Sequence, residues 1–239
     1  MLAAILWGGL AAASLLIGYF LATRGPSQRA IGLIMGIGSG ALVAAIAYEL
    51  VPESILGGWE MGLAFGLGAM AFFLGDWVVD RRGGEDRKDI AGSAESGSGA
   101  AIFIGTLLDN VPESIILGMG IALGGVINLA FLAAVFISNL PEGVAGSLNL
   151  EAAGNTRQRI FGMWLALVIV SALCAGLGYW LANRLPGADG RIAQAFAAGA
   201  MLTMLADAMM PEAFEHGGKM VGLFTALGFL AAAVLSVAG

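Results

Sequence analysis

Residues 108–114, Leu-Asp-Asn-Val-Pro-Glu-Ser, lie in the middle of an apolar segment that runs from about residue 100 to about residue 123. A segment of this length can span a bilayer as a helix, where ionisable side chains are costly. Asp109 and Glu113 are four residues apart and Asn110 and Glu113 three apart, so all three side chains share one helix face. Pro112 cannot donate to the carbonyl one turn earlier, which leaves a further oxygen exposed. The stretch therefore predicts a cation site made of oxygen donors inside a membrane.

The Pro-Glu pair of this stretch recurs near the ends of three more apolar runs, at residues 49–54, 138–143 and 207–213. Four of the six prolines precede a glutamate, so the pattern is a repeated device. The run at 138–143 supplies a second set of oxygen donors, Ser138, Asn139 and Glu142. The other two runs supply acidic groups that we expect at the two mouths of an ion route, where they would raise the local cation concentration. These are Glu49, Glu53, Asp207 and Glu212.

The composition is that of a polytopic membrane protein. Hydrophobic residues make up 59% of the 239 residues and charged residues only 12%, against about a quarter charged in soluble domains. Hydropathy predicts an all-α single domain of eight transmembrane helices. The expected spans are about 3–22, 30–56, 60–80, 99–123, 126–149, 159–182, 191–214 and 219–238.

The polar gap at residues 81–98 is expected to be a flexible loop, because it has too little apolar surface to fold. Nine basic residues fall in the loops after the first, third, fifth and seventh spans, and only two on the other side. The positive-inside rule then makes the first set cytoplasmic. We expect an integral protein of a bacterial plasma membrane with both termini outside.

Internal similarity predicts inverted repeats. An offset of 159 aligns Pro52 and Glu53 with Pro211 and Glu212, so the second span resembles the seventh, which would run in the opposite direction. An offset of 29 aligns residues 110–113 with 139–142 and makes the fourth and fifth spans a second inverted pair. Inverted repeats with broken helices at their interface are a recurrent architecture of alternating-access carriers.

The motifs Asp-Asn-Val-Pro-Glu-Ser at 109–114 and Ser-Asn-Leu-Pro-Glu-Gly at 138–143 resemble the His-Asn-x-Pro-Glu-Gly motifs of the ZIP (Zrt/Irt-like) divalent metal transporters. The eight spans, the outward termini and the long loop after the third span are similar to that family as well. The resemblance implies a carrier that moves Zn, Fe, Mn, Cd or a related ion toward the cytoplasm by an elevator-like shift of one helix bundle past another, often as a homodimer.

Carried over by position, the resemblance implies that Asp109, Glu113, Ser138 and Glu142 hold a first metal. It also implies that Asn110, Asn139 and the two shared glutamates hold a second. This chain departs from the family pattern because Asp109 and Ser138 stand where histidine or another stronger ligand is usual. The sixth span has no acidic residue, and the long loop has no histidine. The second metal position is therefore expected to be weak or missing.

The histidine-free donor set predicts the metal. Carboxylate, amide and hydroxyl oxygens suit hard ions, whereas imidazole and thiolate favour Zn or Cu. We therefore expect Mn or Fe(II) to be preferred over Zn, or the ions to be poorly distinguished. The metal would be the substrate, and neither an organic cofactor nor a nucleic acid is expected as a partner.

Three other interpretations compete with a carrier. The prolines could only shape the bundle, with protonated carboxylates acting as hydrogen-bonding groups. An intramembrane metalloprotease would need His-Glu-x-x-His, and the single histidine, His216, excludes it. A membrane metal sensor or scaffold that does not transport would retain the fold and the glutamates without flux.

Overall fold

The computed structural model describes residues 1–51, 58–92, 94, 98–124, 127–184 and 190–238. These described residues are predominantly helical and contain no strand. Eight helical segments among them are long and apolar enough to cross a membrane, which confirms the predicted all-α polytopic class. The elements are α1 (Leu2–Ala22), α2 (Gln28–Ala45), η1 (Ile46–Leu50), α3 (Trp59–Val79), η2 (Asp80–Gly84), η3 (Glu85–Lys88), α4 (Gly99–Gly124), α5 (Leu129–Ala152), α6 (Arg157–Arg184), α7 (Arg191–Met204), η4 (Leu205–Met209), α8 (Met210–Gly217) and α9 (Met220–Ala238).

Polar caps move some helix starts away from the boundaries that hydropathy predicts. Helix α5 begins at Leu129, a few residues late, because the Asn128 side chain accepts a hydrogen bond from the Phe131 amide at 2.9 Å. Helix α2 begins slightly early, after Ser27, whose hydroxyl accepts from the Ala30 amide at 3.2 Å. A capping oxygen satisfies an amide that the helix leaves open, so it determines the first turn.

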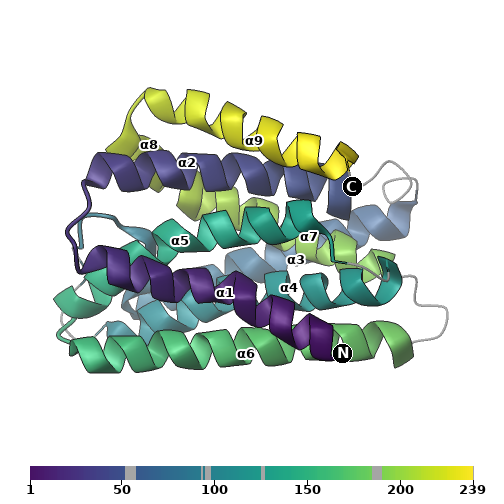
Figure 1. Ribbon diagram of the computed structural model, residues 1–239, viewed down its shortest axis with the longest axis horizontal. Helices are drawn as coiled ribbons and strands as arrows, with labels where there is room; N and C mark the ends of the chain where they lie inside the picture. Colours follow the sequence, from purple (N-terminus) through teal and green to yellow (C-terminus); the bar gives the residue numbers. More distant parts are fainter. Residues whose placement is uncertain (52–57, 93, 95–97, 125–126, 185–189, 239) are drawn as a thin grey trace.

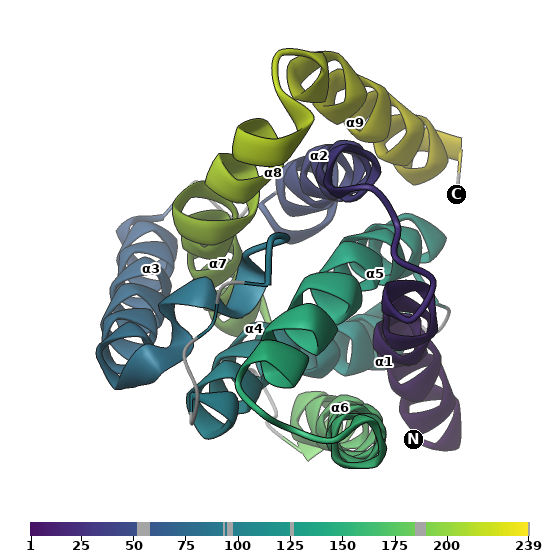
Figure 2. The same cartoon turned by 90° about the vertical axis from the view of Figure 1, so that its left-hand side faces the viewer.

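The helices form two bundles that pack side by side (Figure 2). In the first bundle, α1 packs along α5 and α6, and α4 packs along α6 and α5. In the second bundle, α2 packs along α9 and α8, and α3 packs along α7. The largest contact between the bundles is that of α2 with α5. Both chain termini lie at one end, called here the terminal end, and the α1–α2, α5–α6 and α8–α9 connections lie at the opposite, loop end (Figure 1).

Close helix crossings in the second bundle depend on glycine. A methyl group at Gly40 of α2 would overlap the Thr225 carbonyl of α9, and one at Gly228 of α9 would overlap the Ile37 carbonyl of α2. The α3–α7 crossing is built in the same reciprocal way, with Gly68 against Phe196 and Gly199 against Phe65. Small residues let transmembrane backbones touch, so packing replaces the hydrophobic effect that is absent between helices in lipid.

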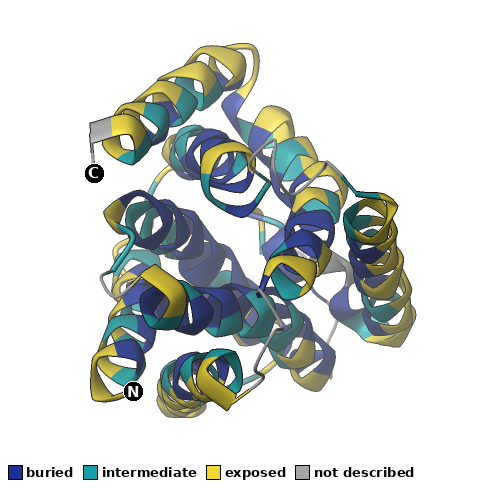
Figure 3. Cartoon of the chain, turned by 90° about the vertical axis from the view of Figure 1, so that its right-hand side faces the viewer, coloured by how far each residue is buried: buried dark blue, intermediate teal, exposed yellow. Residues whose placement is uncertain are grey.

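The outer surface is apolar, as a lipid-facing surface must be. Figure 3 shows exposed residues along the outward sides of the peripheral helices and buried residues toward the centre. On α9, an exposed apolar stripe recurs every three to four residues, formed by Leu223, Leu227, Leu230 and Val234. Exposure of this kind fits hydrocarbon as the solvent and would be unusual in water.

Two π-helical turns interrupt the second and seventh spans. In η1, the Val51 amide donates to the Ile46 carbonyl at 2.8 Å. In η4, the Met210 amide donates to Leu205. Each turn holds one extra residue and often marks a functional position. The two turns fall on each other under the sequence offset of 159, which brings Glu49 and Asp207 close to equivalent places.

The segment after α3 is packed where it is described, unlike the solvated loop that its composition predicts. Arg87, Lys88 and Ile90 are at most 5% exposed, and Ala94 is buried as well. Composition alone misses this burial because the segment docks through charges and backbone hydrogen bonds, with little apolar surface of its own. Its flexibility stays a prediction.

Candidate metal centre

The structure places the six predicted metal ligands in one buried region of the first bundle. Three lie on α4 and three on α5, and each is at most 3% exposed. The Asn139 Nδ2 atom donates a hydrogen bond to Asn110 Oδ1 at 3.1 Å, which joins the two helices at this level. The six residues are Asp109, Asn110, Glu113, Ser138, Asn139 and Glu142.

Helical spacing aligns these side chains in two rows. Asp109 and Glu113 are four residues apart on α4, and Ser138 and Glu142 are four apart on α5, so each pair lies on one face. Both helices continue through their prolines. Two of these side chains donate back to the backbone: Ser138 Oγ to the Val135 carbonyl at 2.9 Å and Asn110 Nδ2 to the Thr106 carbonyl at 3.0 Å. The oxygens are thereby left for other partners.

Five buried side-chain oxygens gather in this region: four have no hydrogen-bond partner among the described residues, and the fifth, Asp109 Oδ2, has ion pairs with basic residues described below. They belong to four of the predicted ligands, with both carboxylate oxygens of Asp109 among them. Buried polar atoms without partners are rare, because each loses its hydration without replacement. Such a group of oxygen lone pairs is suited to a hard cation. The atoms are Asp109 Oδ1 and Oδ2, Glu113 Oε2, Asn139 Oδ1 and Glu142 Oε2.

A lysine from the segment after α3 reaches this region. Lys88 Nζ lies 3.1 Å from Asp109 Oδ2 and 3.3 Å from Glu142 Oε1, so it forms an ion pair with each carboxylate. Burial alone lowers the pKa of Lys88, but the charges of Asp109 and Glu142 outweigh it and raise the pKa above the usual lysine value. Lys88 is therefore a cation at neutral pH, and it bridges α4 and α5.

The neighbouring Arg87 is held mainly by the third span. Its guanidinium pairs with Asp76 and lies 3.1 Å from Asp80 Oδ1, while Asp109 Oδ2 is more distant, at 3.6 Å from Nε. Asp76 and Asp80 therefore both pair with Arg87. Arg87 neutralises acids beside the candidate site and leaves Lys88 as the cation closest to Glu142.

Sequence reasoning overlooked Arg87 and Lys88, although one signal pointed to them. Asp109, Glu113, Glu142 and Asp76 are acids within spans, and such groups are usually paired. The spans offer few basic residues away from their ends, so the nearest supply is the 81–88 cluster. Counting charges per span would have placed part of that cluster inside the bundle.

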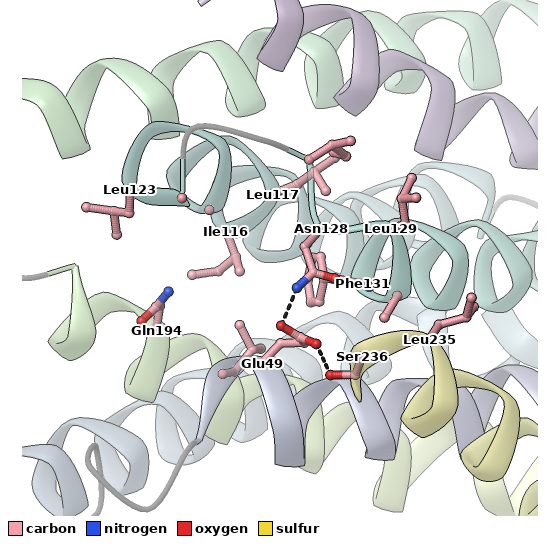
Figure 4. Close-up of a pocket in the computed structure, with 15 residues that line it drawn as sticks. Glu49, Ile116, Leu117, Leu123, Asn128, Leu129, Phe131, Gln194, Leu235 and Ser236 are labelled. Carbon is pink, nitrogen blue, oxygen red and sulfur yellow. Dashed lines mark hydrogen bonds between the residues drawn. The ribbon is translucent and has the colours of Figure 1, made fainter. Parts of the chain in front are cut away.

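Toward the terminal end, a cavity of about 570 Å³ lies between the two bundles. Figure 4 shows Glu49 of η1 at its edge, bonded to Asn128 of the first bundle and Ser236 of α9. The α4 wall carries Leu117, one turn beyond Glu113 on the same helix face. The cavity therefore reaches toward the candidate site. Glu53, the other acid expected at this mouth, lies outside the described residues.

Toward the loop end, a second cavity of about 480 Å³ borders the site. Lys88 lines it, so the lysine stands between this cavity and the α4–α5 carboxylates. Asp207 and Glu212, which the sequence predicts at a mouth, line the cavity and stay apart from the six central residues. Its other charged lining residues are Asp76, Asp80, Arg87, Asp89, Glu215 and His216.

Three potential ligands gather on one wall of the second cavity. His216 Nδ1 lies 2.9 Å from Glu212 Oε1, and His216 Nε2 lies 4.0 Å from Asp89 Oδ1. The same Glu212 oxygen accepts a hydrogen bond from the Ile90 amide at 2.6 Å. His216 is partly buried, and Glu212 also binds the backbone of the segment that carries Lys88.

Comparison with known protein families and with curated proteins finds no match for this chain.

Proposed function

We propose that this chain carries divalent metal ions across the membrane, toward the cytoplasm, through the site between α4 and α5. The observation that carries the proposal is the group of five buried oxygens, four without a hydrogen-bond partner among the described residues and the fifth, Asp109 Oδ2, 3.1 Å from Lys88 Nζ. A cation bound there would satisfy lone pairs that are otherwise costly to bury. The resemblance of the two Asn-x-Pro-Glu motifs to the ZIP family supports the same conclusion.

The charge of the site supports a divalent ion. Asp109, Glu113 and Glu142 lie on facing helices and would repel one another without a cation. A divalent ion neutralises most of that charge, with Asn110 and Asn139 adding neutral oxygens. Because the donors are all oxygens, we propose Mn or Fe(II) as the preferred ions, with Zn and Cd bound less selectively than at an imidazole site.

Two cavities support movement through the site. One lies between the bundles at the terminal end and the other at the loop end, and the α4–α5 carboxylates lie between them. Each cavity carries acids, Glu49 at the terminal end and Asp207 and Glu212 at the loop end. A site reached from opposite sides is what alternating access requires. The excess of basic residues at the loop end supports placing that end in the cytoplasm.

The packing pattern supports an inverted repeat and an elevator-like motion. Exchanging α1 with α6, α2 with α7, α3 with α9 and α4 with α5 maps the α2–α9 pair onto α3–α7 and the α1–α5 pair onto α4–α6. The reciprocal glycine crossings obey the same exchange. The six predicted ligands lie in the first bundle, so a shift of that bundle past the second would move the whole site between the two cavities.

One observation favours a second candidate, a sensor or scaffold that does not transport. The Lys88 ammonium already pairs with Asp109 and Glu142, and such a buried ion pair can be purely structural. Under this alternative the carboxylates would hold the bundle together, with metal bound weakly or without flux.

Uptake by proteoliposomes of the purified chain separates the two functions. Mn, Fe(II), Zn, Co and Cd are offered in parallel to the unmodified chain, to the Glu113→Gln/Glu142→Gln variant and to Glu151→Gln, which changes an exposed glutamate. We expect saturable uptake that falls to background in the double variant and persists in Glu151→Gln. Binding without uptake would favour the sensor, and full uptake by the double variant would exclude these glutamates as ligands.

A further inference from the structure

Lys88 holds the position that a metal ion would need. Its ammonium lies within 3.3 Å of one carboxylate oxygen on α4 and one on α5, and these oxygens belong to Asp109 and Glu142. Both residues are among the predicted metal ligands. An ion bound between them would compete with the ammonium for the same negative charge, because like charges at such short range repel strongly. Lys88 and a divalent ion therefore exclude each other.

The geometry of Lys88 is that of a replaceable cation. Both short ion pairs of Lys88 are with predicted ligands, whereas Arg87 is held mainly by Asp76 and Asp80, which are not predicted ligands. A lysine is a point charge on a flexible stem of four carbons, so it can swing without moving its backbone. Arg87 can stay in place while Lys88 leaves.

A destination for the displaced ammonium adjoins the site. Lys88 lines the loop-end cavity, where Asp89, Asp207 and Glu215 also lie. If the Lys88 side chain rotated into this cavity, its ammonium would leave two buried carboxylates and face the acidic residues that line a more open space. The cost of moving the charge is thereby reduced, since the ammonium stays among acids.

We propose that the Lys88 ammonium is the built-in cation of the site when no metal is bound, and that a divalent ion loads by displacing it into the loop-end cavity. This inference rests on the proposed function and names how the site is loaded. Lys88 then acts as a specificity residue. An ion that carries one charge gains little by replacing an ammonium of the same charge, whereas a divalent ion gains the second charge and can accept several oxygens at once.

The first test compares metal binding by Lys88→Met with that by Lys219→Met. Methionine keeps the stem length without the charge, and Lys219 is the other lysine of the chain and is exposed. Mn binding to the detergent-solubilised protein is measured by equilibrium dialysis. We expect Lys88→Met to bind Mn about fivefold to a hundredfold more tightly than the unmodified chain, the usual range of coupling between two ligands. Lys219→Met should bind Mn like the unmodified chain.

The second test needs no substitution. The chain has two lysines, and mild acetylation modifies their amines. Mass spectrometry measures the acetylation rate of Lys88, with the rate of Lys219 as the internal standard. Lys88 should react slowly without metal and at least severalfold faster with saturating Mn, while the Lys219 rate stays constant. Acceleration that appears with Mn and not with equal ionic strength of Na would support displacement.

The outcomes separate this inference from the proposed function. Mn binding with unchanged Lys88 reactivity and no gain in Lys88→Met would overturn the displacement and leave the metal site standing. Absence of Mn, Fe(II) and Zn binding in both the unmodified chain and Lys88→Met would overturn the metal site and the inference with it. Binding by Lys88→Met alone would overturn the displacement, because the ion would then be unable to replace the ammonium in the unmodified chain.

Discussion

Asn139 donates a hydrogen bond to Asn110 at 3.1 Å, amide to amide, across the interface between α5 and α4. Both side chains are about 1% exposed, so no water competes for the bond. Asn110 in turn donates to the Thr106 carbonyl at 3.0 Å. These two hydrogen bonds fix the orientation of both amide side chains, and Asn139 Oδ1 has no hydrogen-bond partner among the described residues.

Asn139→Ala should destabilise the protein by about 1–3 kcal/mol, because it leaves the buried Asn110 oxygen without its donor. The measurement is denaturant unfolding in detergent followed by tryptophan fluorescence. Asn155→Ala, at the loop end, removes a half-exposed amide that donates to the Leu150 carbonyl and serves as the comparison. A double-mutant cycle with Asn110→Ala should show that the two losses are coupled; additive losses would contradict a direct bond.

Asp109→His should shift ion preference toward Zn by about tenfold relative to Mn, or about 1.4 kcal/mol. The reason is that imidazole favours Zn, whereas carboxylate favours Mn. Competition of Zn against a fixed amount of bound Mn measures the change. An unaltered ranking of ions would mean that residue 109 does not touch the metal.

Arg87→Met should cost about 3–5 kcal/mol of stability, since removing one partner of a buried ion pair leaves uncompensated charge. Asp76, which pairs with Arg87, is the acid left behind. Adding Asp76→Asn to Arg87→Met should recover part of the loss. Unfolding of the two variants in the same detergent tests this. No recovery would show that the unpaired Asp76 carboxylate is not the main cause of the lost stability.

Gly68→Ala should destabilise the protein by about 1–3 kcal/mol, because the new methyl group meets the Phe196 backbone at the α3–α7 crossing. Gly62→Ala on the same helix is the matched control, since nothing lies near that position. In the control, alanine should be neutral or stabilise by up to about 1 kcal/mol through helix propensity. Equal effects of the two substitutions on unfolding would argue against the close crossing.

The stabilising contribution of Lys88 should depend on pH only in the alkaline range. Its pKa is raised above the usual lysine value of about 10.4. A raised pKa in the folded state means that the contribution is fully present below the unfolded pKa and is lost as pH rises through the folded pKa. The difference in unfolding free energy between the unmodified chain and Lys88→Met should therefore be constant from pH 7 to 9. A decline within that interval would show that Lys88 loses its proton earlier.

Hydropathy and motif spacing predict much of this molecule because each depends on short stretches of chain. Eight apolar runs of sufficient length must become helices in lipid, where no other structure satisfies the backbone. Spacing of three or four residues places Asp109 with Glu113 and Ser138 with Glu142 on one face each. These features need no knowledge of the rest of the fold.

The remainder depends on contacts between distant segments. Lys88 looks like part of a solvated loop until α4 and α5 are placed beside it, because only then does its ammonium meet Asp109 and Glu142. His216 likewise has an acidic neighbour, Asp89 of the same segment, which only the fold brings close to it. Local composition describes the surroundings of a residue along the chain, whereas charge pairing depends on its surroundings in space.

The segment that carries Lys88 is fastened to both bundles by adjacent residues. The Asp89 carbonyl accepts from Asn149 of α5 at 2.6 Å, and the Ile90 amide donates to Glu212 of α8 at 2.6 Å. A hydrogen bond tolerates only a few tenths of an ångström of stretch before it weakens. Any larger slide of one bundle along the other must therefore break one of these two bonds. The bond that survives decides which bundle the segment travels with, and hence whether Lys88 accompanies the carboxylates or is left behind.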